Sequence, residues 1–136
     1  MFTVRFAKDG EIHYGKLENN TIHVFAGDIY NKPTITGESY AMDEVQLLAP
    51  CKPSKIICLG LNYRDHAKEF HFDIPKWPIL FMKPQTSVTG PKADIIYPND
   101  LSRRLDYEAE LAVVIGKTAK DVPLKKSMEY VLYLWQ

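Results

Sequence analysis

Alternating polar and apolar residues, separated by turn-forming pairs, dominate the first third of the chain. The alternation runs through three stretches, at residues 2–6, 11–17 and 21–25, and has the two-residue period of half-buried strands. Asp9-Gly10 and Asn19-Asn20 separate these stretches, and such pairs favour tight hairpin turns. The pattern therefore predicts a small antiparallel meander.

Residues 26–50 show no regular period. Pro33 and Pro50 interrupt them, and only the end of the segment, just before Pro50, is apolar. We interpret this segment as a connector with a short buried stretch at its end. The change of pattern divides the chain into a small β domain at residues 1–44 and a second domain at residues 45–136.

The second domain alternates short apolar runs with polar loops. Each run is too short for an ordinary helix and is rich in β-branched or aromatic residues, which favours buried strands. We expect strands at residues 55–59, 79–82, 95–97 and 105–115, of which the last is the most regular. The predominance of strands indicates a mainly β (α+β) fold.

Two helices are expected in the second domain. The first is short and covers residues 62–70, with Asn62 or Asp65 as its cap. The second begins after Asp121, with Pro123 in its first turn, where proline lacks only a hydrogen-bond donor that would be unused anyway.

Composition and charge narrow the classes of function. Seventeen basic and seventeen acidic residues give a formal charge of zero, so no net field attracts the chain to nucleic acid or anionic lipid. The hydrophobic fraction of 46% is ordinary for a soluble protein, and no apolar run approaches the roughly 20 residues of a membrane helix. The N-terminus also lacks the apolar stretch of a signal peptide. We therefore expect a cytoplasmic protein with no nucleic-acid or membrane partner.

Three acidic residues alternate along the strand expected at residues 105–115. Asp106, Glu108 and Glu110 would share one face, and neighbouring carboxylates about 6.5 to 7 Å apart repel by roughly 2 to 3 kcal/mol. Bulk water offsets this repulsion on an exposed edge strand. A hard divalent cation such as Mg²⁺ or Ca²⁺ offsets it too, because such ions take oxygen ligands. The apolar end of the strand favours a cleft, and both interpretations stand.

The expected helix at residues 62–70 carries a second candidate group. His66 and Glu69 are three positions apart and would share a helix face, so the carboxylate can orient the imidazole for general-base chemistry. A surface ion pair would give the same spacing. Lys83, where a strand meets a loop, could hold an anionic substrate or could simply be solvated.

Several motifs of the second domain together have a specific order and spacing. They are Gly60-Leu61-Asn62-Tyr63-Arg64-Asp65-His66 with Glu69, then Phe81-Met82-Lys83-Pro84, and then Asp106-Tyr107-Glu108-Ala109-Glu110-Leu111. In this arrangement they resemble the fumarylacetoacetate hydrolase superfamily. The resemblance covers about residues 45 to 132, and residues 1–44 resemble the small N-terminal β region that many members carry.

The resemblance implies that the chain holds the first part of a mixed β-roll. It also implies a divalent-metal-dependent hydrolase, isomerase or decarboxylase of catabolism, which acts on a small 2-oxo acid such as an acylpyruvate or an oxo-diene-dioate. Many members of the family form dimers, so a homodimer is expected.

The resemblance also assigns roles to individual residues. Glu108 and Glu110 match two metal ligands, for Mg²⁺ or for Mn²⁺ or Ca²⁺. His66 and Glu69 match a dyad that activates water or moves a proton, and Lys83 matches a lysine near the pocket. The motif that precedes the dyad implies substrate contacts for Asn62, Tyr63 and Arg64.

The end of the sequence departs from the family pattern. The third metal ligand of the family is an aspartate on a strand after Tyr130-Val131, and this sequence ends with Leu132-Tyr133-Leu134-Trp135-Gln136 instead. The resemblance therefore implies a C-terminal truncation. One hypothesis is a metal-dependent enzyme that needs a complementary segment. The alternative is a catalytically silent paralogue that self-associates through exposed sheet edges and its aromatic tail.

Overall fold

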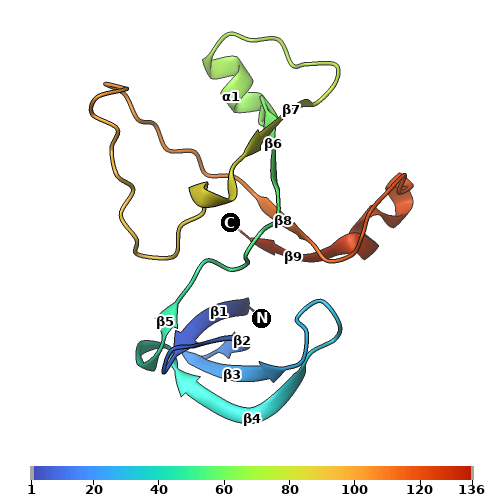
Figure 1. The fold of residues 1–136 in the computed structure, drawn as a ribbon. Helices are drawn as coiled ribbons and strands as arrows, with labels where there is room; N and C mark the ends of the chain where they lie inside the picture. The colour runs from blue at the N-terminus through green and yellow to red at the C-terminus, as the bar shows by residue number, and fades with distance from the viewer. Residues whose placement is uncertain (1, 136) are drawn as a thin grey trace. The chain divides into compact units, whose positions relative to one another are not determined.

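The structure is a computed structural model, in which we describe the backbone of residues 2–135 and the side chains of residues 2–132 (Figure 1). The side chains of the apolar tail from Tyr133 onward therefore lie outside the described part. The chain separates into two compact units. One contains the residues up to Cys51 together with those from Gly90 onward, and the other spans Lys52–Thr89.

The first unit begins with a five-stranded antiparallel sheet in the order β4-β3-β2-β1-β5. Its strands are β1 (Phe2–Lys8), β2 (Glu11–Glu18), β3 (Thr21–Ala26), β4 (Thr34–Ala41) and β5 (Gln46–Leu47). A short 3-10 helix, η1 (Met42–Glu44), joins the last two. The three-stranded meander and its turns agree with the sequence prediction, since Asp9, Gly10, Asn19 and Asn20 all have positive φ angles, as tight hairpins require. The interpretation of residues 26–50 as a connector is wrong, because β4 lies within them.

A small hydrophobic core holds this sheet together. Phe6, Ile22 and Val24 are buried, and Phe6 stacks on His13 with ring centroids 5.5 Å apart. Burying a side chain the size of Phe6 contributes about 1.5 to 3 kcal/mol. Partly buried hydrophobic residues close the edges of this core, namely Val4, Leu17, Tyr40, Val45 and Leu47.

The second unit is a two-stranded antiparallel ribbon with one helix. Its elements are β6 (Ile56–Gly60), α1 (Arg64–Glu69), β7 (Ile79–Lys83) and the 3-10 helix η2 (Gln85–Ser87). Both strands and the helix agree with the sequence prediction. The expected cap does not, because Tyr63 is the N-cap and makes no side-chain cap hydrogen bond. Its extended backbone instead places its carbonyl to accept the first helical bond, from Ala67 N–H at 3.1 Å.

The chain after Gly90 contains less regular structure than expected. It holds β8 (Ala112–Ile115), the 3-10 helix η3 (Leu124–Tyr130) and β9 (Val131–Trp135). The helix expected after Asp121 is present as this 3-10 helix, with Pro123 at its N-cap. The strand expected at residues 95–97 is absent, and the one expected at 105–115 is reduced to its last four residues.

Strand β8 pairs with β9, with Ala112 opposite Trp135 and Ile115 opposite Val131. The alternation of polar and apolar residues alone did not predict the structure of residues 105–111 correctly. No described helix has the length and hydrophobicity needed to span a membrane.

Candidate active site

The predicted dyad lies on α1, which has a buried central residue and is closed at its C-terminal end. Ala67 is buried at 1% exposure and anchors the helix between His66 and Glu69. At the C-terminal end, His71 has a φ of 57° and donates its N–H to the Lys68 carbonyl, while Phe72 N–H donates to the Ala67 carbonyl. These two bonds form a Schellman motif, which satisfies carbonyls that would otherwise be unpaired.

The two members of the dyad differ in their surroundings. His66 is half-buried, and its ring lies against the Phe70 ring with centroids 5.1 Å apart. Glu69 is exposed and follows one helical turn later, which puts both side chains on the same side of the helix. The helix thus holds an imidazole in a partly apolar environment with a carboxylate on the same face.

The predicted substrate-contacting residues immediately precede the dyad. Asn62, Tyr63 and Arg64 are exposed and lie between the end of β6 and the first turn of α1. Leu61, with a φ of 53°, turns the chain out of β6 at this point. The structure thus gathers five candidate residues on one continuous segment, residues 62–69.

Lys83 lies apart from that segment. It is the last residue of β7 and pairs with Ile56, whereas Gly60, where β6 leads toward α1, pairs with Ile79. Four residues of a strand span about 13 Å. The backbone of Lys83 is therefore at the opposite end of the ribbon from α1, and its exposed side chain lies at that end.

Glu108 and Glu110 belong to the other unit, in the irregular segment before β8. Both side chains are exposed, and so is Tyr107 at 97%. The shared strand face and the cleft that we expected for these acids are therefore not formed in the described part of the chain. Asp106 is compensated separately, since the Arg104 Nε lies 2.7 Å from its Oδ2.

Glu108 and Glu110 are suitable ligands for a divalent ion, but two residues do not make a complete ligand set. Two carboxylates match the preference of Mg²⁺, which commonly takes one or two protein carboxylates and completes its shell with water and substrate oxygens. Among the described residues, no group of three or more His, Cys, Asp or Glu side chains could hold a metal ion. The two carboxylates have the donor chemistry that a magnesium ion prefers.

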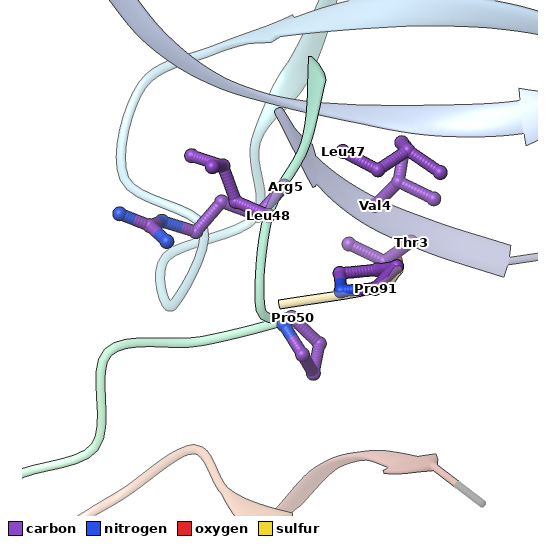
Figure 2. A pocket seen from close by; sticks show the side chains of 7 residues that line it. All are labelled: Thr3, Val4, Arg5, Leu47, Leu48, Pro50 and Pro91. Atoms are coloured by element: carbon purple, nitrogen blue, oxygen red, sulfur yellow. The ribbon is translucent and has the colours of Figure 1, made fainter. Parts of the chain in front are cut away.

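A pocket on the N-terminal sheet was not expected from the sequence. It lies between β1, the β5 segment and Pro91 (Figure 2), and its volume is about 170 Å³. The guanidinium group of Arg5 points away from Val4 and Leu47, and its Nη1 donates to the Ala49 carbonyl at 3.4 Å. The remaining lining residues are largely apolar, so the pocket offers no chemistry of its own. Burial in this region also raises the pKa of the Tyr14 hydroxyl, an effect that Arg5 partly counters.

Comparison with known proteins identifies two family regions. Residues 55–135 match the family described as Fumarylacetoacetate (FAA) hydrolase C-terminal, and residues 1–50 match the one described as Rv2993c-like, N-terminal. An uncharacterized protein of Archaeoglobus fulgidus is 43% identical over 129 residues, which cover 94% of this chain and 47% of that protein. Oxaloacetate tautomerase Fahd2a of Rattus norvegicus is 46% identical over 89 residues, which cover 65% of this chain and 28% of that protein.

Solved structures support the same assignment. The 5-carboxymethyl-2-hydroxymuconate delta-isomerase of Mycobacterium smegmatis superposes with a TM-score of 0.86 at 33% identity, covering 98% of this chain and 52% of that one. The chain thus spans about half the length of relatives that it matches almost from end to end. The mainly β fold and the resemblance seen in the sequence are confirmed, and the chain belongs to the fumarylacetoacetate hydrolase family.

Proposed function

We propose that this chain carries part of the active site of a divalent-metal-dependent enzyme that acts on a small 2-oxo acid. The observation that carries the proposal is the dyad on α1, where a half-buried histidine and a carboxylate three positions later share one side of a helix that is closed at its C-terminal end. Enzymes of this family generally depend on a divalent metal ion. The isomerase and tautomerase names of similar proteins support a reaction in which a proton moves next to a carbonyl.

In the proposed reaction, His66 accepts a proton from the carbon adjacent to the 2-oxo group, or from a water molecule in a hydrolytic reaction. Glu69 keeps the imidazole oriented and stabilises the imidazolium that forms. The apolar contact of His66 with Phe70 limits the rotation of the ring. These roles need only the residues of one helix, which makes them testable by single substitutions.

Glu108 and Glu110 are the proposed metal ligands. When bound, a divalent ion would act as a Lewis acid that polarises the 2-oxo carbonyl. For the substrate carboxylate, Arg64 offers a planar pair of donors. Lys83 is a further proposed site residue, although its backbone lies at the opposite end of the ribbon from α1. Asn62 and Tyr63 would contribute neutral hydrogen bonds beside the dyad. The self-associating silent paralogue is not favoured by the comparisons.

The substrate class can be tested by equilibrium binding. We expect 2-oxobutyrate and Mg²⁺ each to increase the affinity of the chain for the other by about 5- to 150-fold, the usual range for coupled sites, because the 2-oxo acid supplies two oxygens to the ion. Isothermal titration calorimetry with and without Mg²⁺ measures this coupling. Butyrate is the matched control, since it has the same chain length and charge but lacks the 2-oxo group. Equal coupling for both acids, or none for either, would contradict the proposal.

Two further predictions from the sequence belong with this proposal. A cytoplasmic location and a homodimer are expected of such an enzyme.

A further inference from the structure

The Phe70 side chain lies beside the proposed base. Phe70 follows His66 by four positions, and residues four apart are neighbours on the surface of a helix. The two ring centroids are 5.1 Å apart, and the ring planes are inclined to each other by 37°. That separation is within the range of about 4.5 to 7 Å that aromatic pairs prefer. The imidazole of His66 is therefore in contact with a flat aromatic ring.

The end of α1 holds the backbone of Phe70 in place. Phe70 is the C-cap residue, and its N–H donates to the His66 carbonyl at 3.2 Å. The next two residues donate their N–H groups to the carbonyls of Lys68 and Ala67, which completes the Schellman motif. The backbone at Phe70 and just after it is thus hydrogen-bonded to the helix. The start of the Phe70 side chain therefore has a fixed place relative to His66.

Phe70 is not the residue that anchors the helix. Ala67 is the buried residue of α1, at 1% exposure, whereas Phe70 is 46% exposed. A side chain exposed to this degree contributes less to the stability of the fold than a fully buried phenylalanine does. We therefore expect the loss of the Phe70 ring to change the contact with the imidazole more than it changes the stability of α1.

Glu69 and Phe70 would constrain the imidazole in different ways. A carboxylate can accept the N–H of one ring nitrogen, which selects the tautomer. The χ2 torsion of histidine has broad energy wells, so the side chain does not fix the plane of its own ring. A flat neighbour narrows this range, because two rings in contact cannot turn freely past each other. The direction of the basic nitrogen thus depends on both neighbours.

We propose that Phe70 is a positioning residue, which orients the His66 imidazole for proton transfer through the flat shape of its ring. This inference rests on the proposed function of His66 as the base. The Phe70 side chain has no polar atom with which to exchange a proton or bind a carboxylate. Loss of its ring should therefore lower kcat and leave KM almost unchanged, because a misplaced base slows the chemical step rather than substrate binding.

The kinetic test compares Phe70→Leu with Phe70→Tyr. Leucine is apolar and favours a helix but has no ring, whereas tyrosine restores the ring. In the tautomerisation of oxaloacetate with Mg²⁺, we expect Phe70→Leu to lower kcat by about 10- to 100-fold, because a catalytic group misplaced by about 1 Å can cost about 10²-fold. Phe70→Tyr should retain the wild-type kcat. A wild-type kcat for Phe70→Leu, or equal losses for leucine and tyrosine, would overturn the inference.

Phe72→Leu is the matched control for this comparison. Phe72 is a second exposed phenylalanine, at 59%, and the substitution keeps the backbone N–H that donates to the Ala67 carbonyl. We expect Phe72→Leu to have the wild-type kcat, and a loss as large as that of Phe70→Leu would contradict a specific role of Phe70. Phe70→Met, with a flexible apolar side chain, replaces Phe70→Leu if the leucine variant does not fold.

NMR spectroscopy tests the orientation of the imidazole without a measurement of activity. The ring protons of His66 are assigned by their disappearance in His66→Asn. We expect nuclear Overhauser effects between the His66 and Phe70 rings in the wild type, and a change in the His66 chemical shifts in Phe70→Leu because the ring current of Phe70 is lost. Absent Overhauser effects, or unchanged His66 shifts in Phe70→Leu, would overturn the inference. A wild-type rate for His66→Asn would instead refute the proposed function.

Discussion

Replacing His66 by asparagine will slow the proposed proton transfer by about 10²- to 10⁴-fold, the range that a positioned general base contributes. Asparagine keeps a polar side chain of similar size at this half-buried position but cannot accept the proton. The keto–enol interconversion of oxaloacetate in the presence of Mg²⁺, followed by the ultraviolet absorbance of the enol, measures the rate.

The matched control for this substitution is His71→Asn. His71 is a second, exposed histidine near the same helix, and asparagine tolerates its left-handed backbone conformation, so α1 keeps its C-terminal bonds. We expect His71→Asn to retain the wild-type rate. Glu69→Gln should give a smaller loss than His66→Asn, because it removes the orienting charge but leaves the base. Equal rates for His66→Asn and His71→Asn would exclude the proposed role of His66.

Replacing Glu108 and Glu110 together by glutamine will abolish the binding of Mg²⁺. Glutamine keeps the shape of both side chains and removes the two charges that a hard cation requires. Calorimetric titration of Mg²⁺ into the chain should show heat for the wild type and none for the double variant.

Asp106→Asn is the control that separates ligation from general electrostatics. It removes the same kind of charge two residues away, where the carboxylate already pairs with Arg104. We expect this variant to bind Mg²⁺ like the wild type. If Asp106→Asn weakened binding as much as either glutamate substitution, the acidic segment would act only as a diffuse negative surface.

The elements predicted correctly are those whose conformation depends on local interactions. The first three strands follow from alternation and from hairpin pairs such as Asn19-Asn20, and α1 follows from a short helical pattern. β4 was missed because Thr34–Ala41 contains Gly37 and the charged residue Glu38, and it becomes a strand only by pairing with β3. Non-local pairing of this kind leaves little trace in the alternation of residues.

The opposite error occurred before β8. Residues 105–111 alternate as a strand does but are irregular in the structure, so the shared strand face of Glu108 and Glu110 did not follow. Alternation predicts which way side chains point only where a strand forms. The candidate site residues were predicted more from the family motifs than from the expected geometry. The motifs establish membership of the family, whereas the role of each residue is a proposal.

The most direct test of the central claim is the metal dependence of oxaloacetate tautomerisation by the wild-type protein. Its rate is compared in Mg²⁺ and in EDTA, each corrected for the rate without protein at the same metal concentration. Our account predicts acceleration above the protein-free rate in Mg²⁺ and its loss in EDTA. Acceleration that persists in EDTA, or no acceleration in Mg²⁺, would contradict the account.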